Sequence, residues 1–167
     1  MTGFTVAHLH ADRMADAFPL VRMAAPEVSP AQWRRYADWL GRAEGGVLAA
    51  YAGNATLHGV AAYCRDDSLR YGRALRVDLI VSFELSGAAP ARAALLEALA
   101  LVALAKGCET LTVCMPRRGY ADGGSDKAGS WAEQGFALDS VTFAMRIDDL
   151  SIERMRKSSQ LREPAAG

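Results

Sequence analysis

The sequence predicts an α/β fold of the α+β type: a single mixed, mostly antiparallel sheet with a central parallel crossover and helices on both faces. Two observations predict this class. Segments in which apolar residues recur with a period of two are interleaved with segments of helical period along the chain. One long helical segment joins two strand-like segments, and a connection of that length favours parallel strands.

The N-terminal third is expected to contain one strand followed by two helices. Residues 4–10 alternate loosely and predict the first strand. The first helix is expected over about residues 13–23. The second helix should begin at Ser29 and Pro30, because serine caps a helix and proline suits the first helical position.

Strand patterns dominate the middle of the chain. Residues 46–53 and 56–67 both have a period of two, and the short link between them predicts an antiparallel hairpin. The β-branched and aromatic content of residues 74–83 predicts a central strand. A long helix should then end at Lys106 and Gly107, because a cation in the last turn and a glycine after it are typical of a helix end.

The remaining segments should complete the sheet. Residues 109–115 predict a strand parallel to the central one, since the long helix lies between them. A short helix is expected around residues 131–134, followed by a last strand or hairpin within residues 136–147. The polar segment after it could continue as a helix to about residue 161.

Length and composition indicate the class of protein. A chain of 167 residues with 51% hydrophobic and 23% charged residues fits one globular domain. We expect that domain over residues 1–150 and a polar C-terminal tail over residues 151–167. Lys+Arg and Asp+Glu both number 19, so the chain has no overall basic field to attract nucleic acid.

The sequence also bears on compartment and metal content. Its three cysteines form no CxxC pair, which favours a reducing, cytoplasmic compartment. We expect no membrane partner, because no leader pattern is present and the longest nearly uncharged run, residues 93–105, is too short to cross a bilayer. His8 and His10 could chelate a metal from one strand face, but no third ligand is evident, so no metal is expected.

The segment SGAAPA, residues 86–91, precedes the long helix and allows two interpretations. Its small residues leave the backbone amides at the helix entrance accessible, and the helix dipole favours an anion there, so a phosphate could bind. The alternative is a tight turn between strand and helix whose small residues serve packing only.

The order of elements, together with four short motifs, resembles the GNAT-type N-acetyltransferase family over about residues 4–147. The motifs are DLIV at 78–81, SGAAPA at 86–91, ALLEAL at 94–99 and WAEQGF at 131–136. The resemblance implies acetyl-CoA, or another acyl-CoA, as co-substrate and no metal.

In that family the loop amides hold the coenzyme A pyrophosphate, and separated fourth and fifth strands admit the pantetheine arm. The residues that the resemblance assigns to cofactor binding are Leu79, Ile80, Val81, Ser86, Gly87, Ala88, Ala89, Ala91 and Arg92.

The loop departs from the family pattern in two alternative registers. In one register Ser86 replaces the usual arginine or glutamine, and Ala89 replaces the first glycine. In the other, Pro90 falls where a backbone amide would face the phosphate, and proline has no N–H to donate. Both registers remain open from the sequence alone.

The catalytic groups are expected where the central strand ends. An amine attacks only when neutral, so a carboxylate near that point would take its proton, and Asp78 and Glu84 are the candidates. The alternatives are a salt bridge from Asp78 to a basic residue such as Arg76, and a plain loop charge for Glu84. Trp131 stands where the family often has a tyrosine acid, which leaves Tyr120 as the nearest hydroxyl.

The resemblance implies direct transfer of an acetyl group to an amine of a small molecule or a peptide. The alternative is a catalytically inactive GNAT-fold module that acts as a ligand sensor or protein-interaction domain, because both the loop and Trp131 depart from the family pattern. Cys114 is interpreted as a buried thiol, with covalent acyl transfer as the alternative. A homodimer formed through the last strand and the tail is also possible.

Overall fold

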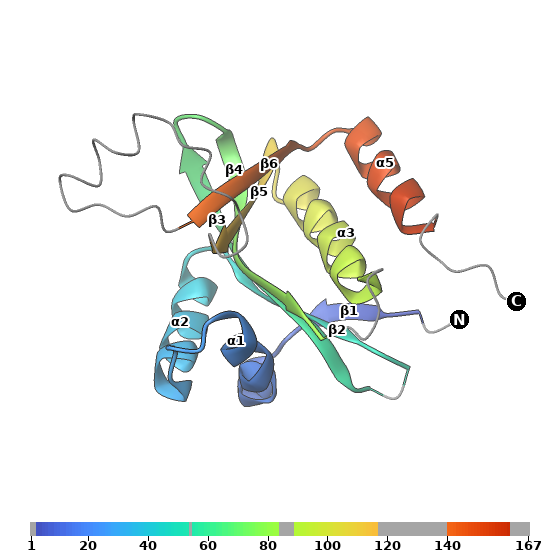
Figure 1. Cartoon of the computed structure of the whole chain (residues 1–167). Helices are drawn as coiled ribbons and strands as arrows, with labels where there is room; N and C mark the ends of the chain where they lie inside the picture. The colour runs from blue at the N-terminus through green and yellow to red at the C-terminus, as the bar shows by residue number, and fades with distance from the viewer. Residues whose placement is uncertain (1–2, 54, 84–88, 117–139, 161–167) are drawn as a thin grey trace, which may run out of the picture.

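The computed structural model describes residues 3–53, 55–83, 89–116 and 140–160. These residues form a six-stranded sheet in which spatial order follows chain order from β1 to β6 (Figure 1). All neighbouring strands are antiparallel except β4 and β5, which are parallel. The strands are β1 (Thr5–His8), β2 (Gly46–Tyr51), β3 (Leu57–Ser68), β4 (Gly72–Ser82), β5 (Thr110–Pro116) and β6 (Ser140–Arg146). The predicted mixed sheet with a parallel crossover is thus confirmed.

Helices cover both faces of the sheet, as expected. Helices α1 and α2 pack on one face, which we call the α2 face, while α3 packs on the other, the α3 face (Figure 1). The helices are η1 (Ala11–Ala17, a 3₁₀ helix), α1 (Phe18–Ala24), α2 (Pro30–Arg42), α3 (Pro90–Ala105) and α5 (Asp149–Gln160). The short helix expected at residues 131–134 lies outside the described residues.

The first predicted helix is in fact two shorter ones. The sequence predicts one helix over about residues 13–23, whereas the structure has the 3₁₀ helix η1 followed by α1. Pro19 lies in the first turn of α1, where its missing N–H costs nothing. A continuous helix would place Pro19 in the interior and lose a backbone hydrogen bond to Ala15, which explains the break.

Helix α2 begins as the sequence predicts and is fixed to the α2 face by its apolar residues. Ser29 Oγ accepts the Gln32 N–H at 3.2 Å, and Gln32 Oε1 accepts the Ser29 N–H at 2.8 Å, which is a capping box. Trp33 and Leu40, about one and three turns after the Ser29 cap, are buried. The Trp33 indole N–H also donates to the Met14 carbonyl at 2.8 Å.

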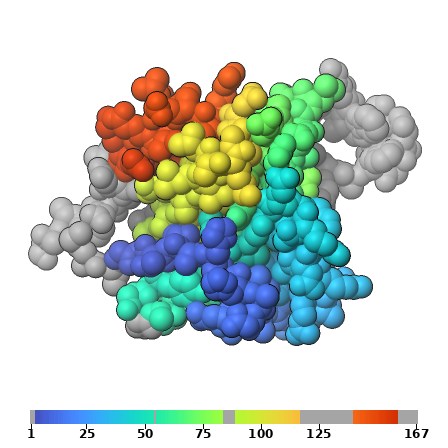
Figure 2. Space-filling model, turned by 180° about the vertical axis from the view of Figure 1, so that it is seen from behind, coloured from blue at the N-terminus to red at the C-terminus, as the bar shows by residue number. Residues whose placement is uncertain are grey.

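Helix α3 provides most of the core on the α3 face. Pro90 is its first residue, and Gly107 follows its end with a φ of 65°, the conformation that favours glycine at that position. Leu95 and Leu99 are fully buried against the sheet. Figure 2 shows α3 exposed between α5 and the N-terminal strand β1.

Helix α5 begins at a polar cap and packs beside α3. The Ser151 N–H donates to Asp148 Oδ1 at 2.7 Å, and the Asp148 N–H donates to Ser151 Oγ at 3.1 Å. Ile152 is buried, and Arg156 forms an ion pair with Glu97 of α3 at 3.0 Å. Residues 151–160, which the sequence sets apart as a polar tail, therefore continue a helix that contacts the domain.

The described helices contain no segment that is both long and apolar enough to span a bilayer.

Removing a buried side chain of α3 should destabilise the fold strongly. We expect Leu99→Ala to lower the free energy of unfolding by about 2–5 kcal/mol, because it leaves a cavity in the core of the α3 face. Leu104→Ala, on the same helix but 50% exposed, is the control and should cost much less. Urea denaturation followed by circular dichroism measures both, and equal losses would contradict the assigned packing.

Candidate functional site

Strands β4 and β5 separate part of the way along their length. Their parallel pairing begins at Ala74 and Thr110 and ends at Val77 and Val113. Beyond that point β4 remains paired with β3 as far as Ser82, and β5 remains paired with β6 as far as Pro116. Each strand is thus held by its outer neighbour, while the facing edges of the two strands are unpaired over residues 78–82 and 114–116.

A β-bulge lies at the point where the strands separate. Val77 pairs with Tyr63 and Leu79 pairs with Ala62, so Asp78 is an extra residue without a partner on β3. A bulge bends its strand and increases the local twist. The bulge at Asp78 therefore explains why β4 turns away from β5 at this residue.

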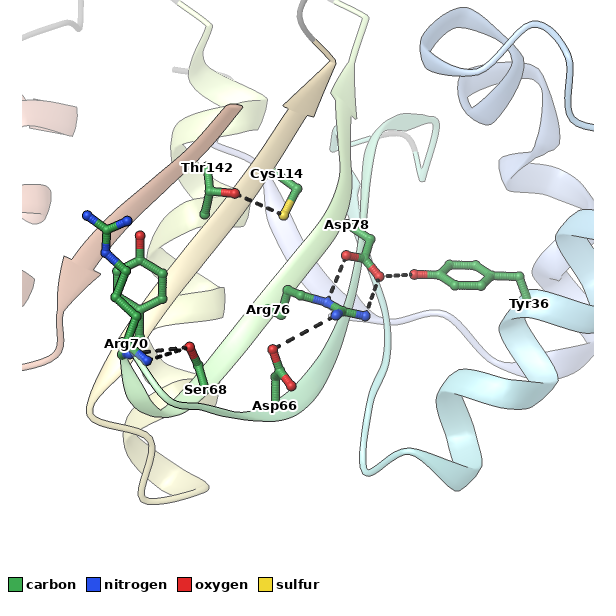
Figure 3. A network of polar contacts seen from close by, with 9 residues as sticks. Tyr36, Asp66, Ser68, Arg70, Arg76, Asp78, Cys114 and Thr142 are labelled. Atoms are coloured by element: carbon green, nitrogen blue, oxygen red, sulfur yellow. Dashed lines mark hydrogen bonds and ion pairs between the residues drawn. The ribbon is translucent and has the colours of Figure 1, made fainter. Parts of the chain in front are cut away.

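The Asp78 side chain is held by two partners on the α2 face (Figure 3). The Tyr36 hydroxyl of α2 donates to Oδ2 at 2.7 Å. Arg76 Nη2 donates to the same oxygen at 3.2 Å, and its Nε lies 2.9 Å from Oδ1 in an ion pair whose N–H is not aligned for a hydrogen bond. Arg76 also lies 3.9 Å from Asp66, so the four side chains form one network.

This network bears on the predicted role of Asp78. The ion pair with Arg76 is the alternative that the sequence left open, and a carboxylate held by two donors is less available to accept a proton from an amine. The network also joins α2 to the bulge. Asp78 as general base stays a prediction, whereas its contact with the α2 helix is a feature of the structure.

Burial raises the pKa of two acidic groups, Tyr36 in the network and Cys64 beside it. The pKa of Tyr36 is raised well above its ordinary value, first because burial disfavours the phenolate and second because the hydroxyl donates to Asp78. Burial likewise raises the pKa of the Cys64 thiol, which pairs with Arg76 across β3 and β4. Both groups therefore stay protonated at neutral pH.

On the α3 face, two adjoining cavities connect the start of α3 with the strand separation. The first, of about 350 Å³, reaches Ala89 and Arg92 at the start of α3. The second, of about 300 Å³, reaches Ile80 and Met115 on the separated strands. The residues common to both cavities are Arg92, Leu96, Met145 and Met155. We call the two cavities together the α3 groove.

The α3 groove has charge at one end and apolar side chains at the other. Arg92 and Arg154 lie near the first turn of α3, where the helix dipole also favours an anion. Toward the strands the lining is aliphatic, aromatic and methionine-rich. An elongated ligand with an anionic part and a less polar arm fits this arrangement.

The backbone at the start of α3 is described from Ala89 onward. Ala89 precedes the helix with a φ of 50°, a left-handed conformation that costs an alanine about 1–2 kcal/mol and that glycine adopts freely. Pro90 follows and offers no N–H. Ala91 is fully buried, so its methyl group belongs to the core rather than to the groove.

The other predicted cofactor residues that the structure describes lie on the unpaired part of β4. Ile80 lines the α3 groove. Leu79 and Val81 are partly buried against the core of the α2 face. Their positions beyond Val77 agree with the predicted separation of the strands.

Several predicted site residues lie outside the described residues. They are Glu84, Ser86, Gly87, Ala88 and Tyr120. Trp131 also falls there. The predicted roles of the first five residues stay predictions.

On the α2 face, other side chains surround the strand separation. Cys114 is half-buried, and its Sγ lies 3.7 Å from Thr142 Oγ1, within hydrogen-bond distance for sulfur (Figure 3). Trp39 stacks on Tyr36 with ring centroids 5.6 Å apart and is 38% exposed. Aromatic and polar groups on this face could contact an acceptor.

Three contributors to the site were not predicted from the sequence. The bond from Tyr36 to Asp78 joins residues 42 apart in the chain, and no local pattern reports such a contact. Arg154 and Met155 line the α3 groove from α5, which had been assigned to the tail. The sequence predicts that this segment could be helical, and the Asp-x-x-Ser cap at residues 148–151 supports that helix, but neither indicates that it lies beside the groove.

Among the described residues, no three histidine, cysteine, aspartate or glutamate side chains gather closely enough to hold a metal ion.

Comparisons with solved structures place this architecture in a known fold. A GNAT-family acetyltransferase from Staphylococcus aureus Mu50 matches with a TM-score of 0.63 at 6% identity, over 87% of this chain and all 100% of that one. The yncA protein from Salmonella typhimurium, solved with its cofactor acetyl-CoA, matches at 0.61 and 13% identity, over 88% and 95% of the two chains.

A third match is a ribosomal-protein-alanine N-acetyltransferase from Brucella melitensis, with a TM-score of 0.54 and 24% identity over 81% of this chain and 93% of that one. The chain therefore has the fold of the GNAT acetyltransferases. No family model and no curated protein sequence matches it.

Removing the Tyr36 hydroxyl tests its contact with Asp78. We expect Tyr36→Phe to lower the free energy of unfolding by about 1–3 kcal/mol, because a partly buried carboxylate loses a hydrogen bond. In the background of Asp78→Asn the same change should cost less, since the charged acceptor is already gone. Chemical denaturation of the two single variants and the double variant measures the coupling, and additive losses would contradict a direct contact.

The raised pKa of Tyr36 predicts a pH dependence of stability. The folded state holds this proton more tightly than the unfolded state, whose tyrosine has an ordinary pKa of 10.0. The stabilising contribution is therefore complete below about pH 10 and is lost as the pH rises toward the folded value. Between pH 9 and about 11 the unfolding free energy should fall less steeply for Tyr36→Phe than for the wild type. Parallel slopes in denaturation at several pH values would exclude this assignment.

Proposed function

We propose that the chain is an acyl-CoA-dependent N-acetyltransferase that passes an acetyl group directly to an amine. The observation that carries the proposal is the separation of β4 and β5 at the Asp78 bulge, with the α3 groove leading to it from the start of α3. The yncA structure, which has the same fold, was solved with acetyl-CoA. The proposed compartment is the cytoplasm, in keeping with three free cysteines.

The described residues are suited to holding acetyl-CoA. Arg92 and Arg154 would contact the phosphates, because guanidinium groups pair well with phosphate oxygens. The apolar part of the groove, including Ile80 and Met115, would hold the pantetheine arm. When bound, acetyl-CoA supplies an acyl group activated as a thioester, whose thiolate leaves readily because thiols have a pKa near 8.5.

The protein itself would then contribute position rather than strong acid–base chemistry. The unpaired edge of β4 after Val77 presents backbone groups that can orient a carbonyl at the strand separation. The network of Tyr36, Arg76 and Asp78 holds the bulge and forms part of the α2 face. An amine that approaches from the α2 face would meet the acyl group where the strands separate.

The amine of the acceptor must lose a proton to a base, and the described residues offer one carboxylate near the strand separation. Asp78 lies at the bulge, but it is held by Arg76 and Tyr36. Glu84 and Tyr120 keep their predicted roles as base and acid at positions that the structure does not describe.

We propose a small-molecule or peptide amine as acceptor, with neither nucleic acid nor a membrane as partner and with a homodimer as the candidate assembly.

Two observations favour a second candidate function. Asp78, the described carboxylate at the strand separation, is already paired, and Ala89 stands at the helix entrance in a conformation that glycine would adopt more easily. A GNAT-fold module without catalysis, acting as a ligand sensor or protein-interaction domain, would tolerate both features. Release of CoA with any amine from a panel of polyamines, aminoglycosides and peptides would eliminate this candidate.

Isothermal titration with acetyl-CoA tests the proposed cofactor site. We expect saturable binding, weakened about tenfold in Arg92→Gln because one charge-assisted phosphate contact is lost. Arg22→Gln, an exposed arginine of α1, is the matched control and should bind like the wild type. The absence of binding heat at millimolar acetyl-CoA, for a protein shown to be folded by circular dichroism, would contradict the proposal.

A further inference from the structure

A polar cavity of about 370 Å³ lies at the end of β5 opposite to the strand separation. Apart from Ala144, its residues differ from those of the α3 groove. Arg70, Tyr71 and Gly72 come from the hairpin between β3 and β4, Glu109 and Thr110 from the start of β5, and Ala144 and Arg146 from β6. We call it the Arg146 cavity.

Strand pairing places the Arg146 cavity on the same face of the sheet as the proposed acceptor side. Residues paired across strands point to the same face, and Arg146 pairs with Thr110, as Thr142 pairs with Cys114. Alternate residues along β5 share a face, so Thr110 and Cys114 both belong to the face of Arg76. Figure 3 shows Cys114, Thr142 and Arg76 projecting from this face, with Arg70 near the lower end of β4.

The distance between the cavity and the strand separation follows from strand geometry. Cys114 lies four residues beyond Thr110 on β5, which corresponds to about 13 Å. Only small side chains occupy the surface between them on β5 and β6. They are Thr112, Cys114, Thr142 and Ala144. Thr112 is buried, whereas Thr142 and Ala144 are exposed, so an extended chain would lie along β6 from one end to the other.

The charges in the cavity favour a ligand with one anionic group. Arg70 and Arg146 contribute two guanidinium groups, and neither forms an ion pair with a carboxylate of the described residues. Arg70 lies over the Tyr71 ring, 5.6 Å from its centroid. Glu109 brings one negative charge to the same lining and disfavours a dense polyanion.

Asp148, at the start of α5, is a second carboxylate that acts on Arg146 through its charge. It accepts the Ser151 N–H at 2.7 Å in the cap of α5 and forms no ion pair with Arg146 among the described residues. Within the part of the chain that the structure describes, no carboxylate therefore pairs with the Arg146 guanidinium.

We propose that the Arg146 cavity binds an anionic group of the acceptor, a carboxylate or a phosphate, about 13 Å from the amine that is acetylated. The inference rests on the proposed function, because that function places the amine at the strand separation. It narrows the acceptor class to an extended amine with one distal negative charge. A peptide amine with a carboxylate about four residues away has this form.

Matched peptides test the inference. Ala-Gly-Gly-Ala with a free carboxylate spans about 13 Å when extended, and the same peptide as a C-terminal amide lacks the charge. Titration calorimetry without cofactor should show the acid binding the full chain about tenfold more tightly than the amide. An amide whose fourth residue is phosphoserine distinguishes phosphate from carboxylate recognition, and the dipeptide acid Ala-Ala, which is too short to span the distance, should lose the preference.

Substitutions in the cavity test whether a preference for the peptide acid over the amide arises there. Arg146→Gln should abolish the acid preference, Arg70→Gln should reduce it, and Arg22→Gln on α1 should leave it unchanged. Equal binding of acid and amide by the wild type, or an acid preference retained in both cavity variants, would overturn the inference.

Release of CoA with acetyl-CoA and the same peptides is measured separately. Turnover without an acid preference would overturn the inference and leave the proposed function intact. An acid preference in binding that Arg146→Gln removes, without turnover of these peptides or of any amine in the panel above, would support the anion site and contradict the proposed function.

Discussion

The structure depends on one constraint, the failure of β4 and β5 to stay paired beyond Val77 and Val113. Parallel strands normally satisfy each other's backbone groups, and an unpaired edge inside a sheet costs free energy unless water or a ligand satisfies it. Here the outer neighbours, β3 and β6, hold both strands in place while their facing edges diverge. An opening of this kind is stable because each of the two strands stays paired with its outer neighbour along this length.

The two faces of the sheet contribute differently to the opening. On the α3 face, α3 and α5 enclose a groove with arginines at one end and apolar side chains at the other. On the α2 face, Tyr36 ties the α2 helix to the bulge through Asp78, and Arg76 completes the network. The first arrangement suits an elongated anionic cofactor and the second provides a rigid, partly aromatic surface. Two ligands that bind on opposite faces would therefore meet at the strand separation and could react there.

Much of this fold could be predicted because its signals are local. The cap at Ser29, the proline at the start of α3 and the glycine after its end each act within one helical turn, and the structure has all three elements in place. The break at Pro19 was missed because helical periodicity outweighed a single residue. The site was harder to predict from the sequence. The Tyr36 contact, the Asp78 bulge and the Arg146 cavity depend on residues that come together only in the folded sheet.

The central claim is that a ligand occupies the space between the separated strands. Backbone amide resonances followed by NMR during an acetyl-CoA titration test it most directly. The account predicts saturable shifts for Leu79, Ile80 and Val81 on β4, for Met115 on β5 and for the first turn of α3, with little change at the hairpin between β2 and β3. Unchanged amide resonances on β4 and β5, or resonance shifts confined to a different surface, would contradict this claim.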